Sequence, residues 1–464
     1  MGSATQPREP YAHIKQWIQS TGLDTLAQRS LEAETIFRKV GITFNVYDAG
    51  GDPERLIPFD LIPRVFSKSE WDMLSAGIEQ RSEALNKFIW DVYHDGSIIA
   101  DGIVPASLIM NNPAYQPSMK GFDPPGGIYS HIVGIDIVRT GNDEFYVLED
   151  NCRTPSGVSY MLENREIMMR MFPEMFETMD IAPVESYPGQ LVKTLRSVKP
   201  AKCEGKPTLA ILSPGAMNSA YYEHCFLADG MGVELVEGPD LFVEDGLVYM
   251  RTTCAPQRVD VLYRRIDDDY IDPEHFRADS VLGVRGLMNA YLTGGVTLVS
   301  APGAGIADDK AVYTYVPEMI RYYLDQEPIL PNVPTWKCSE PADLEYVLAH
   351  LNELVVKEVH GSGGKGLLVG PHASDAERQE FAALVTANPA TYIAQPTLAL
   401  STCPTLTDET LSGRHVDLRP FALVGKDKVR LVPGGLTRVA MREGSLVVNS
   451  SQGGGVKDTW VLEK

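Results

Sequence analysis

The sequence predicts a protein of mixed α+β and α/β class that is built from several packed domains. Strand-like and helical segments alternate between residues 207 and 300, as in a parallel or mixed sheet covered by helices. The last third contains runs of antiparallel strand character around ELVVKEV, GLLVG, TYIAQPT, HVDLRPFALV and KVRLVPGG. At 464 residues the chain is too long for one ordinary core, so two or three domains are expected.

The composition is that of a globular protein, with 44% hydrophobic and 22% charged residues. No apolar run approaches the ~20 residues that cross a bilayer, and MGSATQPREP lacks the basic start and apolar core of a secretory signal. A net charge of −21 disfavours nucleic-acid phosphates and anionic lipids; simple solubility explains it better than a preference for cationic substrates. The six cysteines show no CxxC or CxH spacing, which disfavours zinc and disulfides and favours a reducing cytoplasm.

The first 185 residues divide into a helical part and a hairpin part. Residues 1–95 look mainly helical, because apolar residues in SKSEWDMLSAGIEQRSEALNKFIWDVYHDG recur at helical spacing. Two strand-like runs follow, IYSHIVGIDIVRT and EFYVLED, joined by the turn GND. SGVSYMLENREIMMRMFPEMFETM then reads as a helix.

The remaining residues divide into an alternating part and a strand-rich part. Residues 186–305 contain the strands PTLAILS, VELV, DVLYRRI and GGVTLVS with helices between them. Helices are expected at 308–325 and 341–352, and the strands after them predict a separate α+β lobe over residues 306–464. The final NSSQGGGVKDTWVLEK carries the apolar TWVL, which favours a tail packed onto the fold.

Oxygen-bearing side chains cluster at the predicted hairpin. Asp136 lies in GIDIVR and Glu149 in VLEDN, on strands that the GND turn pairs. Glu149 and Asn151 are two positions apart and point to one side of an extended backbone, whereas Asp150 points away and has a structural role. Two carboxylates and an amide oxygen suit Mg²⁺ when nucleotide phosphates complete its shell. Strand-end carboxylates bonded to turn amides would fit these residues equally well.

A glycine-rich loop follows a strand in LVVKEVHGSGGKGLLVG. The strand delivers Lys357, and the loop over 360–366 includes Lys365. Glycines let backbone N–H groups turn toward phosphates, and lysines neutralise phosphate charge. The pattern is neither a Walker loop nor a Rossmann fingerprint. An ordinary hairpin with a glycine loop is the alternative.

Three further elements carry polar residues on strands. TYIAQPTLAL ends at Gln395, where the backbone could meet an adenine edge, although a plain core strand also fits. Asp417 and Arg419 share one strand face, and Arg438 follows a Gly-Gly turn. Arginines converging beside a glycine loop suit phosphoryl oxygens. A cross-strand ion pair on a solvated sheet is the alternative.

In combination these segments resemble the circularly permuted ATP-grasp family (type 2), related to the synthetase domain of glutathionylspermidine synthetase. The most specific strings are GIDIVR…VLEDNCRTPSGVSYMLENR, GVRGLMNAYLTGGVTLVSAPGAGIADDKA and PGGLTRVA…NSSQGGGVKDTWVL. The E-x-N motif precedes the lysine and glycine loop by about 200 residues, which reverses the usual ATP-grasp order. The resemblance implies a circularly permuted ATP-grasp fold with a mainly helical segment (1–95), a metal-binding half (96–185), a pre-ATP-grasp-like α/β domain (186–305) and a nucleotide-binding lobe (306–464).

The resemblance also implies site residues. The implied Mg²⁺ ligands are Asp136, Glu149 and Asn151. The implied nucleotide contacts are Lys310, Lys357, Gly361, Gly363, Gly364, Lys365 and Gln395. The candidates to contact the reacting groups are Arg153, Ser156, Arg419 and Arg438.

Two points of the resemblance stay open. The related synthetase has an arginine two residues before its first aspartate, whereas this chain has Gly134, and Arg139 or Arg153 is the expected substitute. The polar residues of VDVLYRRIDDD are either substrate contacts or a surface ion cluster; they are Arg264, Arg265, Asp267 and Asp268.

The implied activity is an ATP- and Mg²⁺-dependent carboxylate–amine ligase, which releases ADP and phosphate through an acyl phosphate. The substrates would be a small-molecule or peptide acid and an amine. A phosphotransferase, or a nucleotide-binding subunit or scaffold working with a helical companion protein, are the alternatives.

Overall fold

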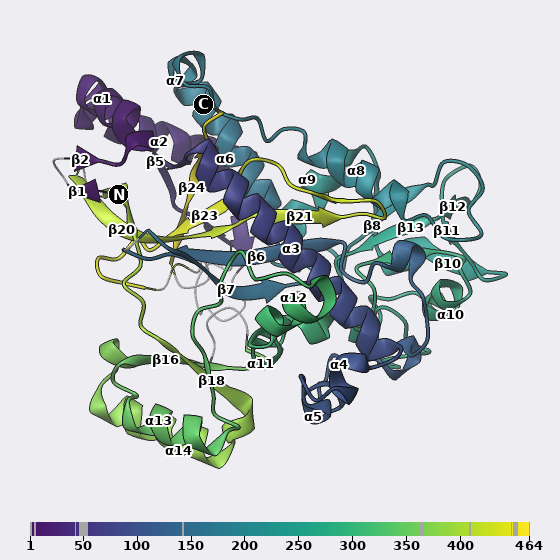
Figure 1. Ribbon diagram of the computed structural model, residues 1–464. Helices are drawn as coiled ribbons and strands as arrows, with labels where there is room; N and C mark the ends of the chain where they lie inside the picture. The colour runs from purple at the N-terminus through teal and green to yellow at the C-terminus, as the bar shows by residue number, and fades with distance from the viewer. Residues whose placement is uncertain are drawn as a thin grey trace.

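A computed structural model of the chain describes residues 2–3, 6–41, 43–45, 54–141, 143–361, 366–407, 410–446, 448 and 453–463. A large body of sheets and helices makes up most of the molecule, and a small lobe lies below it at the lower left of Figure 1. Two short antiparallel strand pairs come before the large sheet in the sequence, β1 (Gly2–Ser3) with β2 (Gln6–Pro7) and β3 (Thr43–Asn45) with β4 (Glu54–Leu56). Among the described residues, no helix is both long enough and apolar enough to span a membrane.

A nine-stranded sheet occupies the centre of the large body. The strands run in the order β22-β21-β6-β20-β23-β24-β5, with β7 paired to β6 and β19 paired to β20. Among the described strands of this sheet only β24 and β5 pair in parallel, so strands from near both chain ends meet here. The strands are β5 (Phe59–Phe66), β6 (Ile132–Arg139), β7 (Phe145–Asn151), β19 (Thr402–Thr407), β20 (Thr410–Arg419), β21 (Phe421–Val424), β22 (Val429–Arg430), β23 (Leu436–Val439) and β24 (Gly455–Val461). The tail does pack onto the fold as expected, since Trp460 is fully buried.

Helices cover the nine-stranded sheet on both faces. Helix α3 (Lys68–Tyr93) crosses one face diagonally in Figure 1, and α12 (Val316–Leu324) packs against it. A second apolar cluster lies against the other face. The helices that contribute to it include α1 (Ala12–Thr21), α2 (Leu23–Val40), α6 (Val158–Met171), α7 (Pro173–Thr178) and α8 (Tyr187–Ser197).

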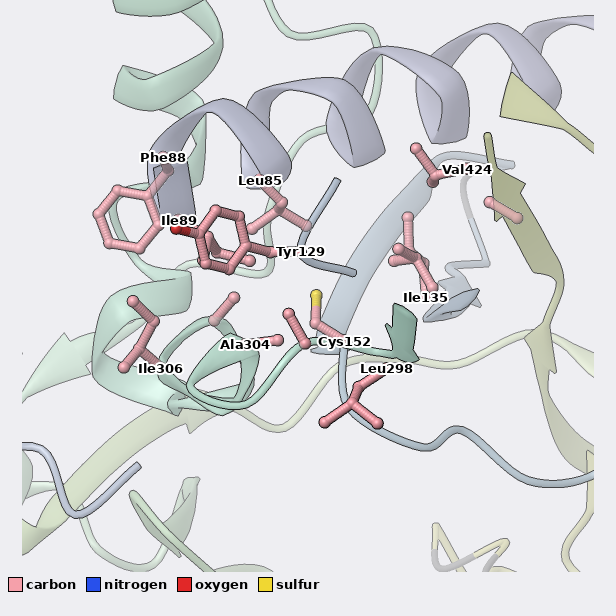
Figure 2. Close-up of a cluster of buried hydrophobic side chains, with 14 of the residues drawn as sticks. Leu85, Phe88, Ile89, Tyr129, Ile135, Cys152, Leu298, Ala304, Ile306 and Val424 are labelled. Carbon is pink, nitrogen blue, oxygen red and sulfur yellow. The ribbon is translucent and has the colours of Figure 1, made fainter. Parts of the chain in front are cut away.

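Helix α3 confirms the helical spacing seen in the sequence. A capping box starts it: Ser67 Oγ accepts from the Glu70 backbone N–H, and the Glu70 carboxylate accepts from the Ser67 N–H. Figure 2 shows Leu85, Phe88 and Ile89 of this helix above a core that includes Cys152. The sulfur directly behind the E-x-N motif is thus packed as an apolar group.

The alternating segment forms a parallel sheet, as predicted. Its order is β14-β13-β8-β9, and each neighbouring pair is parallel. The elements are β8 (Leu209–Leu212), α9 (Tyr221–Met231), β9 (Glu234–Val236), β13 (Val261–Arg264), α10 (Leu287–Leu292) and β14 (Thr297–Val299). A small antiparallel sheet joins β10 (Leu241–Glu244), β11 (Leu247–Met250) and β12 (Gln257–Val259). The connecting helices are α4 (Ser97–Ala100), α5 (Ala106–Met110) and α11 (Lys310–Tyr313).

The small lobe has its own antiparallel sheet and apolar cluster. Its elements are β15 (Trp336–Lys337), α13 (Pro341–Ala349), β16 (Leu354–Glu358), β17 (Leu367–Val369), α14 (Asp375–Ala387) and β18 (Tyr392–Pro396). The expectation that all strands after residue 306 form one separate lobe is wrong, because β19–β24 hydrogen-bond with each other and with β5 and β6. The domain boundaries themselves remain predictions.

Candidate active site

A cavity of about 780 Å³ lies where the small lobe meets the nine-stranded sheet. Its lining residues come from strands β6, β7, β20 and β23 of the large sheet, from strands β16, β17 and β18 of the small lobe, and from the segment before α11. Its size is in the range of nucleotide-sized pockets. The described residues implied as Mg²⁺ ligands, nucleotide contacts or contacts to the reacting groups all line this cavity: Asp136, Glu149, Asn151, Arg153, Ser156, Lys310, Lys357, Gly361, Gln395, Arg419 and Arg438. Gly363, Gly364 and Lys365 lie outside the described residues.

The two acidic strands pair as predicted, with a shift in register between Asp136 and Ile137. Asp136 of β6 lies directly opposite Glu149 of β7, and Gly134 lies opposite Asn151. Asp150 points the other way and forms a two-bond ion pair with Arg81, at 2.6 and 2.7 Å. The alternation of side chains along β7 therefore places one acid in the cavity and one in the core.

Two arginines neutralise Asp136. Arg419 Nη2 donates to Asp136 Oδ2 at 2.7 Å while its Nε donates to Oδ1, and Arg438 Nη2 also donates to Oδ2 at 2.7 Å. Arg438 is shared with Asp417. Burial acts to raise the pKa of Asp136, but the two guanidinium groups outweigh it and hold that pKa below its ordinary value. The arginines expected to face phosphate oxygens are thus bonded to carboxylates here.

Glu149 is poorly compensated by comparison. Its nearest cationic groups are Lys310 Nζ at 3.9 Å and Arg419 Nη2 at 3.8 Å. Burial raises the pKa of Glu149, and the neighbouring Asp136 carboxylate raises it further, although Lys310 and Lys357 oppose the shift. An additional positive charge beside Glu149 would stabilise its ionised form and lower its pKa.

The oxygen donors fit Mg²⁺ in part. Asn151 donates its amide nitrogen to the Gly134 carbonyl at 3.2 Å, so its amide oxygen is the atom available to a ligand. Glu149 and Asn151 therefore offer hard oxygen donors to the cavity, while both oxygens of Asp136 are engaged by arginines. Within the described residues, no group of three or more His, Cys, Asp or Glu side chains is arranged to hold a metal. This donor set fits Mg²⁺ only with phosphate oxygens completing the shell.

Two lysines from different elements, Lys310 of α11 and Lys357 of β16, line the cavity. Lys310 Nζ, at the start of α11, donates to the Gly361 carbonyl at 2.5 Å. Lys357 Nζ, on β16, donates to Gln395 Oε1 at 2.7 Å, and Gln395 in turn donates to Thr335 at 3.1 Å. Burial lowers the pKa of Lys357 to about 8; Glu149 opposes this shift and Lys310 adds to it. The structure thus brings both predicted lysines to one cavity.

The two residues before Lys310 are site residues that the sequence analysis missed. Asp308 accepts hydrogen bonds from the Cys152 backbone N–H and from Arg153 Nε, the latter at 2.6 Å. Asp309 caps α11 and lies 3.3 Å from His360 Nδ1, beside the glycine loop. The run Asp308–Lys310 therefore links the E-x-N strand end to that loop. Three consecutive polar residues in ADDKA are the signal that could have identified it.

Steric crowding explains why this chain has Gly134 where the related synthetase has an arginine. A Cβ atom at Gly134 would lie 2.7 Å from Pro155 Cβ and 3.5 Å from Arg419 Cδ, so no side chain fits there. Arg419 occupies the space beside this position. Arg139 cannot substitute, because it forms ion pairs with Glu70 and Asp143 outside the cavity. Arg153 remains a candidate, since it lines the cavity.

The alternative that the polar residues of VDVLYRRIDDD form a surface ion cluster does not hold for its arginines. Arg264 and Arg265 are buried, at 1% and 6% exposure, whereas Asp267 is exposed. Asp267 and Asp268 line the cavity, and Arg265 bonds to the turn after Asn151. The buried arginines hold backbone and side-chain groups in place.

Comparison with known protein families identifies the family of this chain. The profile of the family described as "Circularly permuted ATP-grasp type 2" matches residues 63–440, which is most of the chain. The chain belongs to the circularly permuted ATP-grasp type 2 family. The predicted family and ATP-grasp-type fold are therefore confirmed. ATP-grasp enzymes generally use ATP and Mg²⁺.

Several relatives align over nearly the whole chain. An uncharacterized protein of Synechocystis sp. is 52% identical over 99% of this chain and 95% of its own length. An uncharacterized protein of Mycobacterium tuberculosis is 49% identical over 98% of this chain and 82% of its own. A Frankia alni protein named "Putative glutamate--cysteine ligase 2-3" is 42% identical over 98% of this chain, which spans 52% of that longer protein. The apo structure of a glutathione synthetase-like effector from Globodera pallida aligns over 95% of this chain and 98% of its own, with a TM-score of 0.57 and 11% identity, which supports the fold alone.

Proposed function

We propose that this ATP-grasp protein is an ATP- and Mg²⁺-dependent carboxylate–amine ligase that forms an amide or peptide bond. The observation that carries the proposal is the convergence of the hairpin acids Asp136 and Glu149 and the two lysines on one cavity, although their segments lie far apart in the sequence. Family membership and the ligase names of the Frankia relatives support an ATP-dependent ligase in general.

The proposed reaction has two steps. A carboxylate oxygen of the acid attacks the γ-phosphorus of ATP, the bond from that phosphorus to the β–γ bridging oxygen breaks, and ADP leaves. The amine then attacks the acyl carbon of the resulting acyl phosphate, inorganic phosphate leaves, and the amine nitrogen loses a proton. Positioning and charge neutralisation provide most of the catalysis in such phosphoryl transfers.

The residues of the cavity divide between these tasks. Lys310 and Lys357 bind the ATP phosphates, and Gln395 holds Lys357 in place. Glu149 and Asn151 would hold Mg²⁺ beside Asp136; when bound, the ion neutralises charge on the phosphates. Arg153 and Ser156 hold the acid and its phosphorylated form at the turn after Asn151. Arg419 and Arg438 keep Asp136 ionised.

A release assay tests the proposal. Purified protein is incubated with MgATP and pairs of acids and amines, beginning with L-glutamate and L-cysteine because of the Frankia names. ADP, phosphate and a condensed product in equal amounts are expected for the correct pair, measured by coupled assay and mass spectrometry. A stable phosphorylated product without amine consumption would indicate a phosphotransferase. Failure to release ADP with every pair, alone and with a companion protein, would refute the ligase.

Lys357 makes nucleotide binding depend on pH. Its pKa of about 8 means that the ammonium is present at pH 7 and is lost as the pH rises through 8. Bound phosphates stabilise the ammonium, so nucleotide binding takes up protons near and above pH 8, and the affinity for MgADP falls as the pH increases. Calorimetry at pH 8.5 in buffers of different ionisation enthalpy should show this uptake. Lys357→Arg stays charged and should show much less; equal uptake by both proteins would contradict the assignment.

A further inference from the structure

The turn between Asn151 and helix α6 is anchored from behind by two buried charged residues. Arg265 follows β13 and Glu223 lies on α9; their exposed fractions are 6% and 1%, and neither lines the cavity. Arg265 Nη2 donates to Glu223 Oε1 at 3.0 Å. A buried ion pair between α9 and the residue that follows β13 thus contacts the turn after the E-x-N motif.

Glu223 binds the first turn of α6. Its Oε2 accepts from the backbone N–H groups of Gly157 at 2.7 Å and Ser159 at 3.1 Å, and from Ser159 Oγ at 3.1 Å. A carboxylate at this position compensates the positive end of the helix. Gly157 has φ of 119°, and a Cβ there would lie 2.6 Å from Leu436 Cδ2, so the turn also requires glycine. Because Glu223 occupies these two N–H groups, they are not available to an anion in the cavity.

Arg265 determines the direction of one such side chain. Its Nη2 donates to Ser156 Oγ at 2.6 Å, and its Nη1 donates to the Pro155 carbonyl at 3.1 Å. A guanidinium group has only donors, so Ser156 Oγ must accept, and the serine proton must be donated elsewhere. Among the described residues Ser156 Oγ has no other hydrogen-bond partner, and Ser156 lines the cavity.

We infer that Arg265 is a positioning residue, which acts through Ser156 and makes its hydroxyl a donor to an anionic oxygen of the transferring phosphoryl group. The positive charge behind the hydroxyl strengthens this donor. Glu223 fixes the guanidinium and the start of α6 together, so the donor keeps its place. The nature of the acceptor rests on the proposed function, while the Arg265–Ser156–Glu223 geometry does not.

Calorimetry with MgADP, with and without aluminium fluoride as a mimic of the transferring phosphoryl group, tests this inference. Wild-type protein is expected to bind the MgADP–aluminium fluoride combination more tightly than MgADP. Ser156→Ala and Arg265→Lys should each reduce this gain about 10-fold while leaving the MgADP affinity near wild type. The double variant should lose no more than either single variant, because both changes remove one coupled interaction.

Arg165→Lys is the matched control. Arg165 is also a buried arginine, but it pairs with Asp458 away from the cavity, so its variant should retain the gain. The inference is overturned if Arg265→Lys retains the gain or if the two single losses multiply in the double variant. Should wild-type protein bind MgADP without any gain from aluminium fluoride, the inference fails alone. Should it not bind MgADP at all, the proposed function fails as well. Ser156→Ala leaves the buried ion pair intact and keeps the test valid if Arg265→Lys folds poorly.

Discussion

Replacing Glu149 by glutamine is expected to lower the rate of ADP formation roughly 10²- to 10³-fold, the size of effect seen when one transition-state charge contact is removed. Glutamine keeps the shape of the side chain but removes the charge that lies 3.9 Å from Lys310 Nζ. It also removes a carboxylate that protein cations compensate less than they do Asp136, so nucleotide affinity should lose its dependence on Mg²⁺. ADP release and MgADP titrations at several Mg²⁺ concentrations measure both effects.

Glu144→Gln is the control for this variant. Glu144 lies just before the same strand but is exposed and outside the cavity, so its replacement should leave both measurements unchanged. A Glu149→Gln protein with wild-type turnover and unchanged Mg²⁺ dependence would contradict the assignment of the E-x-N motif.

The local geometry of the E-x-N hairpin was predictable from the sequence. A three-residue GND turn between two strand-like runs pairs β6 with β7, and alternation along β7 separates Glu149 and Asn151 from Asp150. Both inferences depend on short-range rules, namely the period of a strand and the reach of a hairpin turn.

The partners of these acids were not predictable, because they come from distant segments. Nothing near Asp136 in the sequence indicates that Arg419 and Arg438 bond to it, since this requires the final strands to join the sheet of β6. Likewise, Arg265 reads only as a polar residue after a strand, and its contact with Ser156 lies across 109 residues. The periodicity of a sequence predicts which side of a strand or helix a residue lies on. Which of these sides come into contact depends on the tertiary structure.

The interior ion pair behind the hairpin leads to the largest expected loss of stability. Arg81→Met should lower the free energy of unfolding by about 3–5 kcal/mol, because it leaves Asp150 buried without its cation. Arg81 is 1% exposed, makes two hydrogen bonds to Asp150, and donates from Nη1 to Asn332 Oδ1 at 2.7 Å. Urea unfolding followed by circular dichroism measures the change, with the slope of the transition checked for two-state behaviour.

Two comparisons separate the charge effect from loss of packing. Arg38→Met breaks an exposed pair with Glu34 on α2 and should leave the unfolding midpoint nearly unchanged. The double variant Arg81→Met with Asp150→Leu removes both charges, so it should recover a large part of the lost stability; a loss as large as in Arg81→Met would mean that packing dominates. Because Asp150 lies between Glu149 and Asn151, the single variant should also disturb MgADP binding. The ion pair would then stabilise the fold and the cavity edge through the same strand.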